Sequence, residues 1–341
     1  MKNLQSVFIA VAAAAIVMSA SIPSDRSGDS RSASFNAESN YTWARAKRPK
    51  TGCWPDCREG EWCWQNSCGR YGEWPMTLMP VEAWDKLWMV GNRSTWASVD
   101  GLRWTHYSSN AAWGQRYGME TVFFRNKLWK MGGMERTWDN FKNDVWSSSN
   151  GVDWTLVTPS AAWSQRRGHS VIMYQDRMWV LGGSESSGRR DQLPSKILDD
   201  VWSSVDGKDW VRVTEHSPWS GNDDALVFQG KIWVIGRSGV WHSTDGQVWT
   251  EALSAPGWMD RSGNGCLVFD EKVWVLGGLR KEGTVNDVWS SSDGIEWQKS
   301  VAPWSPRGAE YSVVFHDKLW IFGGKTGRQD DGFSGDVWQM Q

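Results

Sequence analysis

The chain has 341 residues, of which 29 are tryptophan and 35 are glycine. Lysine and arginine together number 37 and aspartate and glutamate 39, so the formal net charge is only -2. Charges of both signs are interspersed along the chain, which argues against a general electrostatic affinity for nucleic acid or anionic membranes. We therefore expect no nucleic-acid partner.

Residues 1–21 have the features of a secretion signal. Lys2 gives a positive start, the run Val7–Met18 is apolar, and small residues at positions 19–21 suit a cleavage site. The run is short for a membrane span, and we expect no span after the signal is cleaved; an uncleaved anchor is the alternative. The mature protein is then secreted, either extracellular or periplasmic. Residues 22–50, rich in Ser, Arg, Lys and Ala, predict a disordered linker.

Four cysteines gather in the segment 51–70, at Cys53, Cys57, Cys63 and Cys68. Four cysteines allow three disulfide pairings, and their spacing does not choose among them. Four thiolates can also hold a structural zinc ion, but the paired Cys-x-x-Cys spacing typical of such sites is absent. Because secretion leads to an oxidising compartment, we predict two disulfides and no metal. A fifth cysteine, Cys266, is predicted to be a buried free thiol.

The cysteine segment also contains the pattern Asp-Cys-x-x-Gly-x-x-Cys from Asp56 to Cys63, followed by Cys68-Gly69. This pattern resembles a small extracellular cysteine-rich module. The resemblance implies the pairs Cys53–Cys63 and Cys57–Cys68. So short a segment has little core of its own, and crosslinks would stabilise it by limiting its unfolded ensemble.

The rest of the chain is a repeat marked by tryptophan. In each of six units a tryptophan follows a basic residue and one hydrophobic residue, and most of these segments end in Gly-Gly, as in KLWKMGG and RMWVLGG. Units of 41 to 54 residues with several short strands are typical of β-propellers, since one blade cannot bury both of its faces alone. We predict an all-β, six-bladed propeller of four-stranded antiparallel blades, with most tryptophans buried between blades. The six tryptophans are Trp88, Trp129, Trp179, Trp233, Trp274 and Trp320.

Turns and chain ends add two predictions. Pairs such as Asn150-Gly151 follow the third strand of a unit, where a two-residue type I′ hairpin turn would lead into the fourth strand. The last unit ends with a third strand around Trp338 and has no fourth. Residues 71–77 resemble the start of a fourth strand, so we predict that they pair with the strand around Trp338 and close the ring. The propeller would then span residues 71–341.

The repeated units resemble kelch repeats. They share a Gly-Gly pair after the second strand, an aromatic pair further on, and an Arg-x-Gly-His approach to the first strand, which Arg166 to His169 preserve intact. In the other units this last signature is eroded. The resemblance covers residues from about 73 to 341 and implies a kelch-type propeller.

Candidate functional residues lie on one face of the predicted propeller. The loops between second and third strands open on this face and are long in units 2, 3, 5 and 6 but short in units 1 and 4, which favours an asymmetric groove. Trp138 lies in one long loop and is a candidate ligand-binding residue. Four arginines begin innermost strands on the same face and would bind a carboxylate or phosphate if they converge. Alternatively, each is a scaffold residue bonded to nearby loop carbonyls. They are Arg116, Arg166, Arg261 and Arg307.

Evidence for catalysis in the sequence is weaker. Glu120, Glu310 and His169 follow these arginines and are the candidates for acid–base chemistry. We find no nucleophile constellation, phosphate loop or metal motif, and we expect no cofactor. A copper oxidase similar to galactose oxidase, another kelch propeller, would need two Tyr and two His ligands, whereas the histidines are scattered singly over different units.

We therefore favour a secreted, monomeric binding protein that recognises a carbohydrate, an acidic ligand or a protein partner on the loop-rich face. The alternative is an enzyme, an isomerase such as a sugar mutarotase or epimerase that uses Arg and Glu at the channel mouth. This alternative is implied by the resemblance to kelch propellers that mutarotate sialic acid.

Overall fold

The structure, a computed structural model, describes residues 41–46, 79–91, 94–108, 111–135, 140–185, 196–221, 223–308, 311–327, 334 and 336–341. Of residues 61–64, 67–70 and 79 it describes the backbone alone. The predicted leader, most of the predicted linker, and the candidates Trp138 and Glu310 lie outside these residues. None of the described segments is a helix that could cross a membrane.

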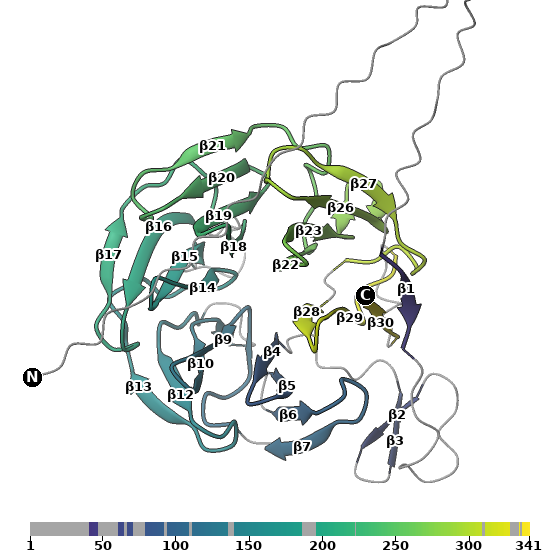
Figure 1. Cartoon of the computed structure of the whole chain (residues 1–341). Helices are drawn as coiled ribbons and strands as arrows, with labels where there is room; N and C mark the ends of the chain where they lie inside the picture. The colour runs from purple at the N-terminus through teal and green to yellow at the C-terminus, as the bar shows by residue number, and fades with distance from the viewer. Residues whose placement is uncertain are drawn as a thin grey trace, which may run out of the picture. The chain divides into compact units, whose positions relative to one another are not determined.

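Six four-stranded antiparallel blades are arranged as a six-bladed β-propeller (Figure 1), which confirms the predicted fold class. In chain order, blade 1 contains β4 (Met79–Ala83), β5 (Lys86–Val90), β6 (Thr95–Ser98) and β7 (Thr105–Ser108); blade 2 contains β9 (Glu120–Phe124), β10 (Lys127–Met131), β12 (Val145–Ser148) and β13 (Thr155–Thr158); blade 3 contains β14 (Ser170–Tyr174), β15 (Arg177–Glu185), β16 (Lys196–Ser204) and β17 (Val211–Thr214). Blade 4 contains β18 (Asp224–Phe228), β19 (Lys231–Gly236), β20 (Gly239–Ser243) and β21 (Thr250–Leu253); blade 5 contains β22 (Gly265–Phe269), β23 (Lys272–Leu276), β26 (Asp287–Ser291) and β27 (Gln298–Val301); blade 6 contains β28 (Tyr311–Phe315), β29 (Lys318–Phe322), β30 (Val337–Met340) and β1 (Trp43–Arg45).

The first strand of each blade lies nearest the axis of the ring. Each of these strands contacts the first strands of both neighbouring blades, and β28 contacts β4, so that the ring is complete. Two short two-stranded pairs lie among the loops on one face; one joins two different loops and the other lies within a single loop. They are β8 (Arg116–Tyr117) with β11 (Met134–Glu135), and β24 (Leu279–Arg280) with β25 (Gly283–Thr284).

The tryptophans build the core between blades, as predicted. Each of the six repeat tryptophans is at most 5% exposed and donates its indole N–H to the carbonyl five residues before it, as Trp129 does to Phe124 (3.0 Å). In five blades, the glycine of the turn between the third and fourth strands packs closely against the ring of one of these tryptophans. A Cβ on Gly207 would lie 2.3 Å from the Trp129 ring, so the bare backbone is what permits this contact.

The turns differ from the prediction. At Asn150-Gly151 only the glycine has a positive φ (74°), and the Asn150 side chain accepts hydrogen bonds from the amides of Val152 and Asp153 (2.9 Å each). This is an Asx-type turn, so the predicted type I′ turn is wrong here. Two consecutive positive φ values occur instead between the first and second strands of all six blades, for example at Arg125 and Asn126. The tight, strongly twisted turns therefore lie at the inner hairpins.

An N-terminal strand closes the ring, as predicted, but it is not the predicted segment 71–77. The fourth strand of blade 6 is β1, which pairs antiparallel with β30, so that Arg45 faces Trp338. Between other blades, nine to eleven residues connect a fourth strand with the next first strand. A closing strand at 71–77 would leave one residue before β4, too few to cross from the outer edge of one blade to the axis.

Two aromatic residues dock this closing strand. Trp43 packs edge-on against Trp304 (centroids 6.0 Å apart), as Trp154 of blade 2 packs against Trp113 (4.7 Å). Tyr41 packs edge-on against Trp274 (4.9 Å) and donates a hydrogen bond to Asp270 (2.7 Å). The stretch around β1, predicted as linker, is thus part of the propeller.

The cysteine segment therefore lies in the chain between the last strand of blade 6 and the first strand of blade 1. Its described backbone is a hairpin of β2 (Glu61–Trp64) and β3 (Ser67–Arg70), in which Cys63 and Cys68 are direct cross-strand partners. The side chains of Cys53, Cys57, Cys63 and Cys68 lie outside what is described, and their pairing stays a prediction. Cys266 on β22 is a free thiol that is only partly buried; burial and then the charge of Asp224 raise its pKa well above the ordinary value.

Candidate functional site

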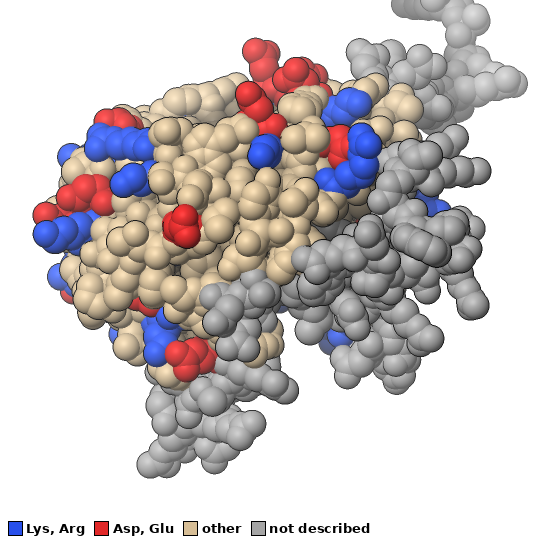
Figure 2. Space-filling model, turned by 90° about the horizontal axis from the view of Figure 1, so that it is seen from below, with Lys and Arg blue, Asp and Glu red and all other residues tan. Residues whose placement is uncertain are grey.

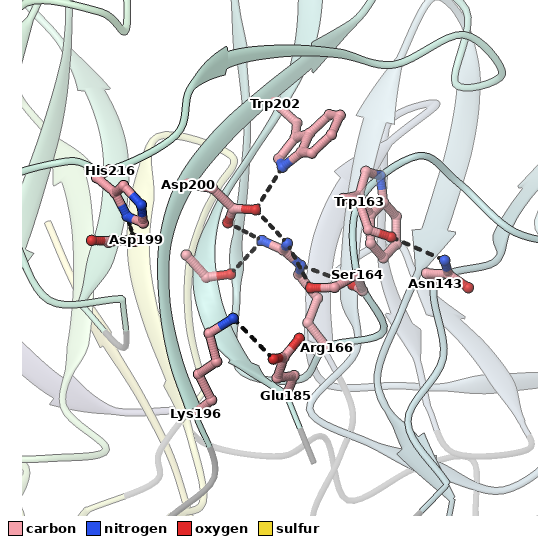
Figure 3. A network of polar contacts seen from close by, with 11 residues as sticks. Asn143, Trp163, Ser164, Arg166, Glu185, Lys196, Asp199, Asp200, Trp202 and His216 are labelled. Carbon is pink, nitrogen blue, oxygen red and sulfur yellow. Dashed lines mark hydrogen bonds and ion pairs between the residues drawn. The ribbon is translucent and has the colours of Figure 1, made fainter. Parts of the chain in front are cut away.

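The four arginines on the loop-rich face share one geometry, drawn for Arg166 in Figure 3. Its two Nη atoms donate to the two carboxylate oxygens of Asp200 (2.6 and 2.8 Å), and Nη1 also donates to the carbonyl of Gly182 (2.9 Å). The indole of Trp202 donates to the same carboxylate (2.7 Å). Equivalent bidentate pairs join Arg116 to Asp144, Arg261 to Asp287 and Arg307 to Asp336.

These contacts give the arginines a scaffold role. Arg166 and Arg307 have no exposed surface, and Arg116 and Arg261 are at most 5% exposed. Burial acts to raise the pKa of Asp200, but hydrogen bonds from Arg166 and its charge outweigh burial and lower the pKa below the ordinary value. The geometry therefore favours the scaffold alternative over the predicted ligand-binding role, because the guanidinium groups are enclosed and paired within their own blades.

His169 is likewise enclosed. It is 1% exposed, its ring lies against Gly132, and neither ring nitrogen has a hydrogen-bond partner among the described residues. Burial, followed by the charge of Arg166, lowers its pKa to about 3, so the imidazole is neutral near neutral pH. A neutral, buried imidazole is poorly placed to exchange protons with a ligand.

The other catalytic candidate within the described residues, Glu120, belongs to a cluster of polar side chains around the axis. Glu120, Ser170 and Asp224 are the first residues of β9, β14 and β18, three neighbouring inner strands. The Asn264 amide, just before β22, donates to Asp224 (3.2 Å), and Lys130 lies on β10 behind Glu120. We call these five residues the axial cluster. Since first strands begin on the loop-rich face, the cluster lies at that end of the axis.

The two carboxyl groups of the axial cluster have strongly raised pKa values. Burial and the charge of Asp224 raise the pKa of Glu120 to about 8, against the opposing effect of Lys130. Burial and the charge of Asp223 raise the pKa of Asp224 to about 7, against the hydrogen bond from Asn264. Both side chains retain partial exposure to solvent. Near neutral pH this site can both donate and accept protons.

Lys130 is buried inside the blade, and its charge acts on Glu120. Its ammonium donates to the carbonyl of Val90 (3.0 Å) and the hydroxyl of Thr121 (3.2 Å), and the residue is 1% exposed. Burial and then the charge of Arg116 lower its pKa to about 7, while Glu120 opposes this. Lys130 thus cannot touch a ligand, but its charge acts on Glu120.

Comparison with known proteins shows the fold alone. No protein-family model and no curated protein sequence matches the chain. Among solved structures 456 chains match, one of which is the structure of YjhT, with a TM-score of 0.62 and 15% sequence identity. That alignment covers 77% of this chain and 94% of YjhT. At this identity the likeness supports the propeller, and function must be argued from the site.

Lys130 was missed in the sequence although a signal was present. The residue after the repeat tryptophan is apolar in every other unit, and only unit 2 has a charge there. The six residues in order are Met89, Lys130, Val180, Val234, Val275 and Ile321. One charged residue in a column of buried hydrophobic residues has a large desolvation cost, which makes it a candidate for function.

Charged side chains of both signs are mixed on another face of the molecule (Figure 2). On the face seen in Figure 2, basic and acidic residues are interspersed and no continuous patch of one sign is visible. No group of three or more His, Cys, Asp or Glu residues in the described part of the chain could hold a metal ion. The axial cluster is therefore the candidate site, and its carboxyl and amide groups are the ones that can contact a ligand.

Proposed function

We propose that this protein is a secreted kelch-repeat propeller that binds a small polyhydroxylated ligand, a carbohydrate, at the loop-rich end of its axis. Secretion rests on the predicted leader, and the kelch assignment rests on the Gly-Gly pairs and the Arg-x-Gly-His approach. The ligand class rests on the axial cluster.

The observation that carries the proposal is the presence of two partly exposed carboxyl groups, Glu120 and Asp224, with pKa values near neutrality. A carboxyl group that is largely protonated at pH 7 donates a hydrogen bond, and its ionised neighbour accepts one. Sugar hydroxyl groups need both kinds of partner. Asn264 adds an amide at the same place. The Ser170 hydroxyl beside it is bonded to the backbone of blade 4, donating to the carbonyl of Asp223 (3.2 Å) and accepting from the amide of Ala225 (3.1 Å).

The same observation favours a second candidate, the isomerase. Ring opening of a sugar requires a base to take the proton of the anomeric hydroxyl and an acid to give a proton to the ring oxygen as the carbon–oxygen bond breaks; reclosure reverses both transfers. Two carboxyl groups with pKa values of about 8 and about 7 suit acid and base near neutral pH. Arginine, which the sequence suggested as a partner of Glu, is not needed in this version.

The test is a panel of monosaccharides with the wild type and the variants Glu120→Gln and Asp224→Asn, read by saturation-transfer NMR for binding and by exchange NMR for interconversion of anomers. We expect each variant to lose binding of any sugar that the wild type binds. Asp317→Asn is the matched control, because Asp317 is exposed in the turn after β28 and its positive φ (54°) suits asparagine.

Unchanged sugar binding in both variants would exclude the axial cluster as the site. Accelerated anomer exchange that is lost in either variant would favour the isomerase, whereas binding without acceleration would favour the binding protein.

A further inference from the structure

A cleft between blades 4 and 5 lies outside the axial cluster. Its volume is about 630 Å³, within the range of small-molecule sites. Ser262 and Leu279 are joined in its lining by two backbone hydrogen bonds (3.0 and 2.8 Å), and the hairpin of β24 and β25 contributes Arg280. Arg237 enters from the short loop between β19 and β20. The lining is thus held by paired backbone.

Two arginines of the cleft have donors to spare. Arg237 is exposed, and of the described residues only the carbonyl of Arg261 accepts a hydrogen bond from its guanidinium (Nε, 3.2 Å). Arg280 donates from Nη2 to the carbonyl of Gly257 (3.2 Å), while its Nε is buried with no partner among the described residues. The Nη atoms of Arg237, for which the described residues supply no acceptor, are therefore donors that a ligand in the cleft can use.

The charges of the lining define the ligand further. Lys281 is a third basic residue in the lining of the cleft. The acidic residues Asp260 and Glu282 line the same cleft. Three cationic and two anionic groups leave a small positive excess, which suits one carboxylate better than a dianionic phosphate. The two acidic groups can accept hydrogen bonds from hydroxyl or ammonium groups of the same ligand. Met259 and Leu279 offer apolar contacts to its carbon frame.

We infer that the cleft between blades 4 and 5 is a separate binding site for a small organic monocarboxylate that also carries hydroxyl or ammonium groups. Arg237 and Arg280 bind the carboxylate, and Asp260 and Glu282 accept the ligand's hydrogen-bond donors. The site shares no residue with the axial cluster.

The experiment uses gluconate as probe, with glucitol as its neutral counterpart and inorganic phosphate as a second anion, on the full mature protein by titration calorimetry. We expect gluconate to bind at least about tenfold more tightly than glucitol or phosphate. Arg237→Gln combined with Arg280→Gln should reduce gluconate affinity by about tenfold or more. Arg125→Gln, an exposed arginine paired with Asp176, is the control.

Equal binding of gluconate and glucitol, or of gluconate and phosphate, would overturn the assignment. Because the double variant could disturb the hairpin, wild-type amide shifts are a second measurement; gluconate should move signals of residues 259–262 and 279–282, and shifts confined to other parts of the chain would contradict the site. Glu120→Gln should leave gluconate affinity unchanged, so failure here is distinguishable from failure of the sugar site.

Discussion

Blades 3 and 4 are neighbours with the same four-stranded topology, but at the loop-rich face the arginine of blade 3 is buried in an ion pair and that of blade 4 is exposed. In blade 3, Arg166 is fully buried and paired with Asp200. In blade 4, Ser220 stands at the position of Arg166 and Gly239 at that of Asp200, so both halves of the ion pair are absent. The arginine that blade 4 does have, Arg237, is exposed on a short loop.

The difference distinguishes arginines that hold the scaffold together from an arginine that can bind a ligand. Arginine and aspartate occur together in blades 2, 3, 5 and 6, which have the long loops, and blade 1 lacks both, as blade 4 does. The ion pair ties the segment just before the first strand to the third strand and so anchors a long loop. Where the loop is short there is nothing to anchor, and an arginine stays available. Residues that break the repeat are therefore better functional candidates than residues that obey it.

The largest effect is expected on the free energy of unfolding, when Arg166 of blade 3 and Arg237 of blade 4 are each replaced by alanine. Arg166→Ala removes the fully buried member of the pair and leaves the partly buried Asp200 carboxylate without its partner, and we expect a loss of about 3–5 kcal/mol in the free energy of unfolding. Arg237→Ala removes an exposed side chain with one backbone contact, and we expect a loss below about 1 kcal/mol. Urea denaturation measures both. Similar losses in the two variants would mean that Arg237 is also a scaffold residue.

The sequence was sufficient to predict the fold. Tryptophan columns, Gly-Gly pairs and strand spacing are local signals that every blade repeats, and six copies leave little freedom of architecture. The closing strand was missed because Trp43 and Trp74 both match the start of a fourth strand in sequence. The length of the connection to β4 distinguishes them, and this is a physical constraint that could have been applied in advance.

The candidate site was only partly predictable. Glu120 was identified from its place beside Arg116, but its raised pKa depends on its burial and then on the charge of Asp224, which lies two blades away. The joint presence of Arg and Asp in four blades was visible in the sequence and favours paired scaffold residues over a converging arginine cluster. The cleft beside Arg280 could not be foreseen, because it depends on how the hairpin of β24 and β25 packs beside blade 4.

A smaller effect concerns the pH dependence of the two blades. The pKa of Asp200 lies below its ordinary value of 3.8, so its stabilising contribution is present above that pH and is lost as pH falls through the folded-state pKa. The pKa of Asp223 in blade 4 is raised, chiefly by burial, which its hydrogen bonds from Ser238 and the Arg237 amide do not offset. Its contribution is present below pH 3.8 and is lost as pH rises through the raised pKa.

Asp200→Asn and Asp223→Asn should therefore have opposite slopes. With the free energy of unfolding measured by urea between about pH 3 and pH 7, the difference between wild type and Asp200→Asn should widen as pH rises. The difference between wild type and Asp223→Asn should shift in favour of the variant over the same range. Parallel slopes would show that the two carboxylates have equivalent environments, against the contrast between blades 3 and 4.

The smallest expected effect is a change in the pKa of a single carboxyl group, that of Glu120. Lys130→Met restores the apolar residue that the other blades have at this position, and it removes a positive charge that lowers the pKa of Glu120. We expect the pKa of Glu120 to rise above about 8, measured by NMR titration of the side-chain carboxyl carbon. Lys127→Met on the same strand is the control, because Lys127 is exposed and should leave this pKa in place. If the pKa of Glu120 falls or does not change in Lys130→Met, the break in the repeat at Lys130 has no electrostatic role at the axis. If it rises, Lys130 acts through Glu120, as a residue that positions a proton and never touches the ligand.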